Sequence, residues 1–421
     1  MSRRFRRIAA LTLIAFATGS LILFYYQSIR NHNYEGGNDL SSYLAASDDF
    51  YRGQNPYREK PRRYIYPLFL ASVVYPLAAL QSGALEKSIA AGLWSLMAFL
   101  AFFGLLAKTV KTLPQWPGSG SITDAEIKLS RGQELTLYAA LVALLHPFMQ
   151  DEFLNGQINL FIVGACGWYF LALEKKRHRQ AGLALALAAT LKIAPGALAL
   201  YALFTRRYRT LGYFSAFLAL FVFGLPLLVN SNSIEYYSYF MKTVSAALVA
   251  GESELSFKSY SILSTAGHVF GFGMSPGTKI TTVFALAMTL GSLPLFELSR
   301  YPKSDTGSGF ARFIAFSAML VVIPLTFPMS ESHHLLILIY PALITAALWM
   351  KRDAPVSSSP IRAPALLLSG AFVILHLGQA FKGTPLRTLA LLGIYGGLLW
   401  LLRRCSPSDY GARSTADEKS G

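Results

Sequence analysis

Ten apolar runs of spanning or near-spanning length divide this chain of 421 residues, and they constrain its fold more than any other feature. Backbone groups inside a bilayer have no water to bind, so runs of this kind form helices or closed barrels. Only 14% of the residues are charged, whereas a soluble domain carries roughly 25%. The sequence therefore predicts an all-α integral membrane protein, a multi-pass bundle of about 10–13 transmembrane helices. The runs lie near residues 8–26, 87–107, 134–148, 156–173, 211–229, 279–296, 310–326, 333–350, 364–381 and 387–402.

The chain begins with a segment similar to a signal peptide, "MSRRFRRIAALTLIAFATGSLILFYY", in which basic residues precede an apolar run. That run ends in Phe24, Tyr25 and Tyr26, and not in the small residues of a cleavage site. We therefore expect a retained first transmembrane helix. Cys166 and Cys405 lie far apart, and they provide neither a disulfide framework nor a metal-binding spacing.

Clusters of Lys and Arg indicate the orientation, because cytoplasmic loops carry an excess of these residues. Placing every cluster inside requires an even number of spans before the cluster at 108–131. The runs 8–26 and 87–107 already supply that number, so the apolar segment 67–81 is predicted to be re-entrant or to lie on the surface. The clusters are Arg3 to Arg7, Lys108 to Arg131, "KKRHR" at 175–179, "RRYR" at 206–209, Lys351 to Arg362, and Arg403 with Arg404.

The apolar segment 181–204 has a basic cluster on each side, so a single span would place one cluster outside. Lys192, Pro195 and Gly196 interrupt the segment in its middle. Two half-length helices that turn there satisfy the charge rule, and each arm of about 11 residues is ~16 Å long. That length is half of the ~30 Å hydrocarbon core. The sequence thus predicts a short re-entrant helix pair around Lys192, with its turn at membrane depth.

The same rule, applied along the chain, places most of the unusual polar residues on one side. We expect this side to be the periplasmic face of a bacterial inner membrane, with both termini in the cytoplasm. Residues 1–402 would form one transmembrane domain, and 403–421 a polar cytoplasmic tail without fixed structure. The predicted outer segments are 31–66, which is the first periplasmic loop, 149–155, 230–278 and 327–333.

Lys192 is an isolated cation in an apolar run. Such a group costs about 2.5–3.5 kcal/mol on insertion scales, and usually lines a pathway or meets a partner. At a turn that opens to the outer side, its ammonium suits a phosphate held at the boundary between lipid and water. The alternative is a single tilted helix from which the Lys192 side chain reaches the interface.

Asp39 follows the first apolar run on the outer side, where a carboxylate suits a general base. The alternative is a cap of the helix that "NDLSSYLAA" begins, and Asp48 and Asp49 match the charged surface of that helix. His333 and His334 open an apolar run on the same side. They would shuttle protons or donate hydrogen bonds to a phosphate, and the alternative is a polar helix cap.

Uncharged polar and aromatic groups suit a sugar substrate. Gln157 and Asn159 lie in "NGQIN", before an apolar helix, and tyrosines crowd the first outer loop, among them Tyr43, Tyr57 and Tyr66. The tyrosines would stack on sugars, or would form an interfacial belt. The chain has no phosphate-cradling Gly-rich loop and no nucleotide fingerprint, so we expect no nucleotide cofactor. The sequence leaves open whether a divalent metal takes part.

Three blocks of the sequence, in this order, resemble glycosyltransferase family 87. The first contains "DLSSYLAA" from Asp39, "GQNPY" ending at Tyr57, and "YP" at Tyr66. The second contains "GQIN" and "AGLALALAATLKIAPGALALYALFTRR", which includes Lys192. The third is "SESHHLLILIYP", which includes Ser332. The blocks cover most of the chain to about residue 350.

The resemblance implies a GT-C-type membrane fold and transfer of a hexose, typically mannose, from a polyprenyl-phosphate donor with inversion. By the resemblance, Asp39 would deprotonate the acceptor hydroxyl, and Lys192, His334 and His333 would stabilise the departing phosphate. The implied partners are the lipid-linked donor, a glycan, glycolipid or lipid acceptor, and membrane lipid, but no nucleic acid. The substrate-binding residues would be Tyr43, Tyr57, Tyr66, Gln157, Asn159 and Ser332.

The sequence is also compatible with two other functions. A transporter or flippase for a lipid-linked sugar also uses broken helices, but it needs access from both faces. A non-catalytic membrane subunit would leave Asp39, Lys192 and His334 without a shared pocket.

Overall fold

The computed structural model of the protein describes residues 3–31, 38–58, 64–80, 83–112, 130–244, 259–270, 275–301, 309–327, 331–350, 362–380 and 384–404. Every regular element within these residues is helical. In chain order they are α1 (Arg3–Asn31), α2 (Asp39–Tyr51), α3 (Leu68–Val73), α4 (Tyr75–Ala78), α5 (Ala84–Thr112), α6 (Arg131–Asn155), α7 (Asn159–Glu174), α8 (His178–Leu191), η2 (Ala194–Leu198), α9 (Ala199–Phe204), α10 (Tyr208–Ala219), η3 (Leu220–Gly224), α11 (Leu225–Val229), α12 (Ser233–Tyr239), η4 (Phe240–Val244), α14 (Ile262–Phe270), α15 (Pro276–Ser299), α16 (Gly309–Thr326), η5 (Ser332–Leu338), α17 (Ile339–Met350), α18 (Arg362–Ala380) and α19 (Leu386–Arg404).

Six helical segments are long and apolar enough to cross a membrane, and four shorter apolar helices accompany them. The long segments also carry large apolar side chains on the outside of the bundle, such as Leu11, Leu228 and Phe284. An exposed apolar surface of this kind suits contact with lipid. The prediction of an all-α, multi-pass membrane protein is therefore confirmed.

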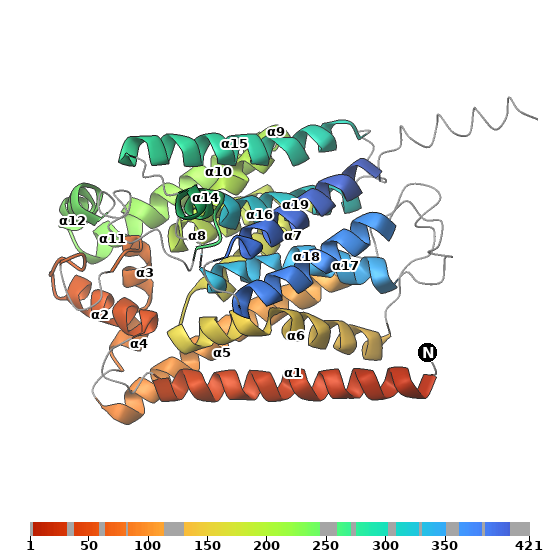
Figure 1. Cartoon of the computed structure of the whole chain (residues 1–421). Coiled ribbons are helices and arrows are strands. Elements are labelled where there is room, and N and C mark those ends of the chain that lie inside the picture. The colour runs from red at the N-terminus through yellow and green to blue at the C-terminus, as the bar shows by residue number, and fades with distance from the viewer. Residues whose placement is uncertain are drawn as a thin grey trace, which may run out of the picture.

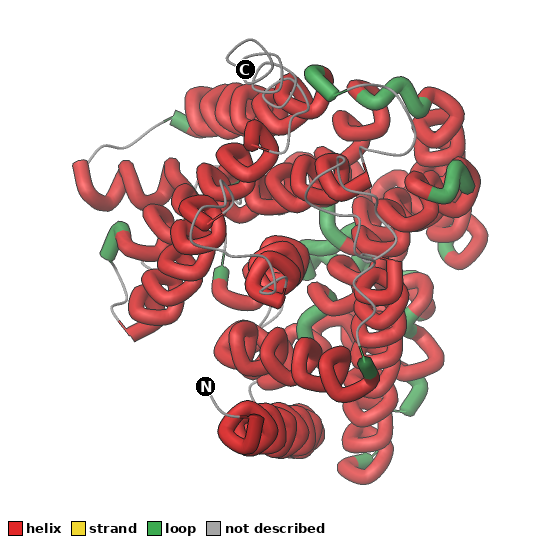
Figure 2. Tube along the Cα trace, turned by 90° about the vertical axis from the view of Figure 1, so that its right-hand side faces the viewer, coloured by secondary structure: helices red, strands yellow, loops and turns green. Residues whose placement is uncertain are grey.

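The long helices lie roughly along one direction, and the short ones gather at one end of the bundle. In Figure 1, α1 and α15 run across the view, while α2, α3, α4, α11 and α12 lie at the left, away from the N-terminus. Figure 2 shows α1 and several other helices end-on. Helix α1 packs against α5 and α6, and α16 packs against α15 and α19. The bundle thus has two distinct ends, one of which holds the first-loop helices.

The segment 181–204 folds as the predicted pair of half-length helices. Helix α8 ends at Leu191, and Lys192 has extended backbone with φ −156° and ψ 133°. Pro195 then lies in the short 3₁₀ helix η2, which packs back on α8. The return brings the start of α10 beside the start of α8, where the side chains of His178 and Thr210 are hydrogen-bonded at 2.9 Å. The basic clusters at both starts therefore lie at the same end of the hairpin, as the charge rule predicts.

The first outer loop is structured around α2. Its N-cap is Asn38, whose side chain accepts a hydrogen bond from the Ser41 N–H at 3.0 Å. The following apolar segment, predicted not to span, forms α3 and α4, which have six and four residues and are too short to cross a bilayer. Both helices pack against α2. At the other end of the chain, α19 continues to Arg404 and so includes the first two residues of the predicted tail 403–421. The rest of that tail lies outside the described residues.

Candidate active site

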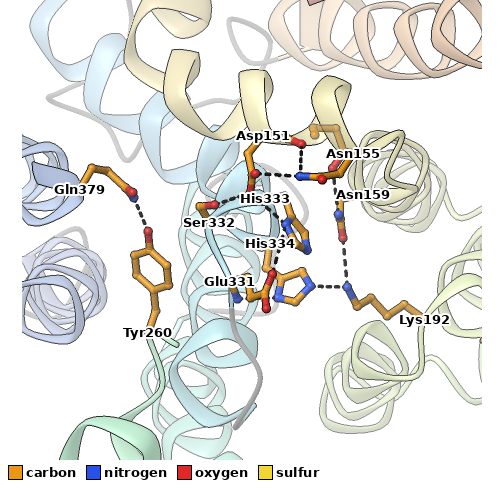
Figure 3. Close-up of polar contacts among 11 residues, drawn as sticks. Asp151, Asn155, Asn159, Lys192, Tyr260, Glu331, Ser332, His333, His334 and Gln379 are labelled. Carbon is orange, nitrogen blue, oxygen red and sulfur yellow. Dashed lines mark hydrogen bonds and ion pairs between the residues drawn. The ribbon is translucent and has the colours of Figure 1, made fainter. Parts of the chain in front are cut away.

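Lys192 and His334 meet at the centre of a polar cluster. The Lys192 Nζ atom is in hydrogen-bond contact with His334 Nε2, and it donates to Asn159 Oδ1 at 3.4 Å. These three residues come from the break after α8, from η5 and from the first residue of α7. Figure 3 shows their side chains converging from separate elements. The fold therefore joins three of the residues that the sequence singled out.

The backbone beside His334 defines which of its ring nitrogens carries the proton. The Glu331 N–H donates a hydrogen bond to His334 Nδ1 at 3.0 Å. A nitrogen that accepts carries no proton, so in the neutral ring the proton is on Nε2. This N–H then faces the Lys192 Nζ atom, so an ammonium there sets two donors against each other, and an acceptor between them would relieve the conflict. Two converging donors of this kind suit the oxygen atoms of an anion such as phosphate.

Asn159 is held by a buried carboxylate. Helix α6 ends at Gly156, whose φ of +60° is the left-handed conformation that glycine adopts readily. The chain reverses there and α7 begins at Asn159. The Glu152 carboxylate, which is only 1% exposed, accepts from Asn159 Nδ2 at 2.9 Å and from the Leu160 N–H at 3.0 Å. Glu152 therefore connects the end of α6 to the start of α7.

His333 faces the Asp151 carboxylate, whereas the ring of its neighbour His334 faces Lys192. The His333 Nδ1 atom is 3.1 Å from Asp151 Oδ2, which also accepts a hydrogen bond from Ser332 Oγ. Asn155 Nδ2 donates to the other oxygen of Asp151 at 2.9 Å. The two adjacent imidazoles are nearly perpendicular, with ring centroids 4.4 Å apart. Each histidine thus serves its own network, and Ser332 belongs to the Asp151 network.

Asp151 and Glu152 are site residues that the sequence did not single out. They lie in "QDEFLNGQIN", which is polar and follows an apolar run, and that contrast was the only available indication. The role of Glu152 depends on the reversal at Gly156, which brings Asn159 back to α6, whereas Asp151 meets Ser332 and His333 of η5.

Asp39, in the first turn of α2, belongs to the same neighbourhood. Its negative charge acts on the Lys192 ammonium and on the Tyr43 and Tyr66 hydroxyls. Burial, together with the Asp39 charge, raises the pKa of Tyr66, so this hydroxyl keeps its proton and remains a hydrogen-bond donor. The Lys192 ammonium is therefore within electrostatic range of two carboxylates, first Glu152 and then Asp39.

The other predicted loop residues are packed inside the protein. Tyr43 and Tyr57 are fully buried, and the Tyr57 hydroxyl donates to the Tyr66 carbonyl oxygen at 2.9 Å. Tyr43 packs edge-on against Tyr66, with ring centroids 4.9 Å apart. Gln157 is also buried, and its side-chain oxygen has no hydrogen bond within the described part of the chain. Their roles as substrate-binding residues remain predictions.

The two remaining acids of α2 differ from each other. Asp48 forms an exposed ion pair with Arg52 at 3.0 Å, which agrees with a surface position. Asp49 is only 7% exposed, so its prediction as helix surface was wrong. Helix α2 is enclosed on more than one side, because Ser47 and Tyr51 contact α3 and the Phe50 carbonyl oxygen accepts from Asn230.

An apolar pocket lies next to Lys192 and His334. Asn159, Lys192 and His334 provide its polar lining. Among the residues that the structure describes, no group of three or more His, Cys, Asp or Glu is arranged to hold a metal ion. The pocket combines its three polar lining residues with an apolar wall. The wall is formed by Ile162, Val163, Ala194, Pro195, Ile323, Pro324, Phe327 and Ile337.

Comparison with known proteins finds one matching family. The model of glycosyltransferase family 87 matches residues 64–328. A curated relative from Mycolicibacterium smegmatis, a polyprenol-phosphate-mannose-dependent alpha-(1-2)-phosphatidylinositol pentamannoside mannosyltransferase, is 26% identical over 293 residues. The match covers 68% of this chain and 66% of the relative, just under two thirds of its length. The crystal structure of ArnT from Cupriavidus metallidurans in the apo state overlaps with a TM-score of 0.44 at 15% identity, covering 94% of this chain and 77% of that one.

Proposed function

Because the chain belongs to glycosyltransferase family 87, we propose that it transfers a hexose from a polyprenyl-phosphate donor to an acceptor hydroxyl. Mannose is the first candidate for the sugar, since the curated relative is named as dependent on polyprenol-phosphate-mannose. The acceptor would be a glycan, a glycolipid or a lipid. The proposed donor carries its own energy in the sugar–phosphate bond, so the reaction needs no nucleotide.

The observation that carries this proposal is the pair of polar groups, Lys192 and His334, in the lining of an apolar pocket. Lys192 and His334 suit the phosphate, and the apolar lining next to them suits the first isoprene units of the lipid. The phosphate of the donor, a phosphodiester, carries one negative charge. It gains a second negative charge when it leaves as polyprenyl phosphate. Donors that are already in place stabilise the charge that develops during bond breaking.

Asp39 is the proposed general base. The acceptor hydroxyl would give its proton to the Asp39 carboxylate while its oxygen forms a bond to the anomeric carbon. The bond from that carbon to the phosphate oxygen would break, and polyprenyl phosphate would leave with the electron pair. Attack from the face opposite the phosphate inverts the configuration. The negative charge of Asp39 acts on the Lys192 ammonium, which supports a common site for the two roles.

We place this chemistry on the periplasmic face of the bacterial inner membrane, with both termini in the cytoplasm. Support comes from the hairpin, whose two ends carry the basic clusters at 175–179 and 206–209 while its turn carries Lys192. Basic residues favour the cytoplasmic side. The turn therefore faces away from the cytoplasm.

Purified protein in nanodiscs, supplied with radiolabelled polyprenyl-phosphate mannose and candidate acceptors, tests the proposal. We expect Asp39→Asn and Lys192→Ala each to reduce transfer by about a hundredfold or more, because each removes a catalytic group. Asp48→Asn is the matched control, since Asp48 is exposed and paired with Arg52. Wild-type transfer rates in both site variants would refute the proposed mechanism. Release of polyprenyl phosphate, followed by mass spectrometry, separates transfer from a flippase, which would move the donor intact.

A further inference from the structure

We propose that Glu152 is a positioning residue, which orients the Asn159 amide and through it holds Lys192 in place for the donor phosphate. The proposal rests on the proposed function, because it assumes that Lys192 binds that phosphate. Glu152 does not touch Lys192 in the hydrogen-bond network. Its charge attracts the Lys192 ammonium, but its hydrogen-bonding effect passes through one intermediate side chain and is therefore indirect.

The network joins three side chains in a row, from Glu152 through Asn159 to Lys192. Glu152 Oε2 accepts from Asn159 Nδ2 at 2.9 Å, and Asn159 Oδ1 accepts from Lys192 Nζ at 3.4 Å. Glu152 and Asn159 are 1% and 4% exposed, so water does not compete for these bonds. Figure 3 shows Asn159 between the end of α6 and Lys192.

The chemistry of the two outer groups decides the orientation of the amide. A carboxylate only accepts hydrogen bonds, and an ammonium only donates them. Asn159 must therefore turn its NH₂ group toward Glu152 and its oxygen toward Lys192. A carboxylate at position 152 thus sets which end of the amide faces the ligand site.

Glu152 also has a second role, which the test must separate from the first. Its Oε1 atom accepts from the Leu160 N–H at the start of α7, one of the backbone donors that a helix start leaves without an internal partner. Glu152→Gln keeps an oxygen that can cap this N–H, but its new NH₂ group then faces Asn159. Either orientation of the glutamine sets one donor against another, so Asn159 can no longer offer its oxygen to Lys192 without a clash.

A second substitution restores the polarity. In the double variant Glu152→Gln with Asn159→Asp, the new carboxylate at 159 accepts from Gln at 152 on one side and from Lys192 on the other. The net charge of the pair is unchanged, and the cap of Leu160 N–H remains. Asn159→Asp alone places two carboxylates next to each other, and it should therefore also disturb the site. The double variant should repair what each single change damages.

The test is the dissociation constant of farnesyl phosphate, a short polyprenyl phosphate, measured by isothermal titration calorimetry on the full chain in nanodiscs. We expect Glu152→Gln to weaken binding about tenfold, the size of one hydrogen bond to a charged group. Asn159→Asp should weaken it as well, and the double variant should bind within about threefold of wild type, because contacting residues are coupled. Thermal unfolding of each variant checks that it is folded.

Lys192→Ala separates this inference from the function on which it rests. If Lys192→Ala binds farnesyl phosphate as wild type does, the proposed phosphate site is wrong. If it loses binding while Glu152→Gln binds normally, the phosphate site stands and the role of Glu152 is refuted. A folded double variant that binds farnesyl phosphate as weakly as Glu152→Gln would also refute the role of Glu152, because the polarity of the amide would then be irrelevant.

Discussion

At the residue scale, His333 depends on Asp151 for its orientation. The Asp151 carboxylate accepts from His333 Nδ1 at 3.1 Å and from Ser332 Oγ, which leaves His333 Nε2 as the acceptor of the neutral ring. Asp151→Asn replaces one accepting oxygen by a donor, which must face either His333 and Ser332 or the Asn155 NH₂ group. We expect the transfer rate to fall about tenfold, measured as kcat with the lipid-linked donor. Unchanged kcat, in a variant as stable as wild type, would contradict this.

Residue types and positions in the sequence singled out Lys192, Asn159 and the histidine pair, and the resemblance to family 87 added Ser332. They did not separate His333 from His334, because the difference arises from Asp151 on one side and Lys192 on the other. Glu152 and Asp151 could not be identified individually. Their partners are distant in sequence or lie beyond the Gly156 turn, and a linear pattern does not report such contacts.

At the element scale, the hairpin of α8 and η2–α9 is held against α10 by a close approach at Gly182. A Cβ atom there would lie 2.5 Å from the Tyr213 Cβ and 2.7 Å from the Phe214 backbone nitrogen. Gly182→Ala therefore forces α8 and α10 apart, and we expect it to destabilise the protein by about 1–3 kcal/mol. Thermal unfolding in detergent measures the effect.

The matched control lies in the partner helix. A Cβ atom at Gly212, in α10, would meet nothing within 4 Å, so Gly212→Ala should be neutral or should stabilise by about 1 kcal/mol through helix propensity. Equal unfolding temperatures for the two alanine variants would contradict the close packing of α8 on α10.

The break at Lys192 was predictable as an element because two basic clusters, one on each side, require the chain to return. The short helices α3 and α4 follow from the same counting of spans. The detailed form of the turn was not predictable. The turn consists of one extended residue followed by a 3₁₀ helix, and this form depends on packing against α8 and α16. A linear sequence pattern does not report such packing.

At the scale of the whole molecule, the hairpin predicts which loops face the same compartment. Lys175 and Arg209 are exposed at its basic ends, and Arg58 is exposed in the first outer loop. With the two native cysteines replaced, a cysteine at 58 should react with a membrane-impermeant maleimide in intact spheroplasts. Cysteines at 175 and 209 should react only after the membrane is opened. Labelling of 175 or 209 in intact spheroplasts would overturn the proposed orientation.

The helical class and the succession of apolar runs were predictable because bilayer thickness and backbone hydrogen bonding leave few alternatives. The neighbours of each helix were not. Helices α1 and α6 are in contact although their centres lie more than a hundred residues apart in the sequence. Helices α16 and α19 are in contact across about eighty residues. These contacts decide where the polar residues meet.

The extended backbone at Lys192 has a consequence for how this segment can vary. Lys192 faces the polar cluster, while the next side chain, Ile193, is 66% exposed. A replacement at either position changes one side chain and leaves the other where it was. Insertion or deletion of a single residue in the turn would instead exchange their directions, turning the ammonium outward and an apolar group inward. Position 193 should therefore accept changes of residue type far more readily than the turn accepts a change of length.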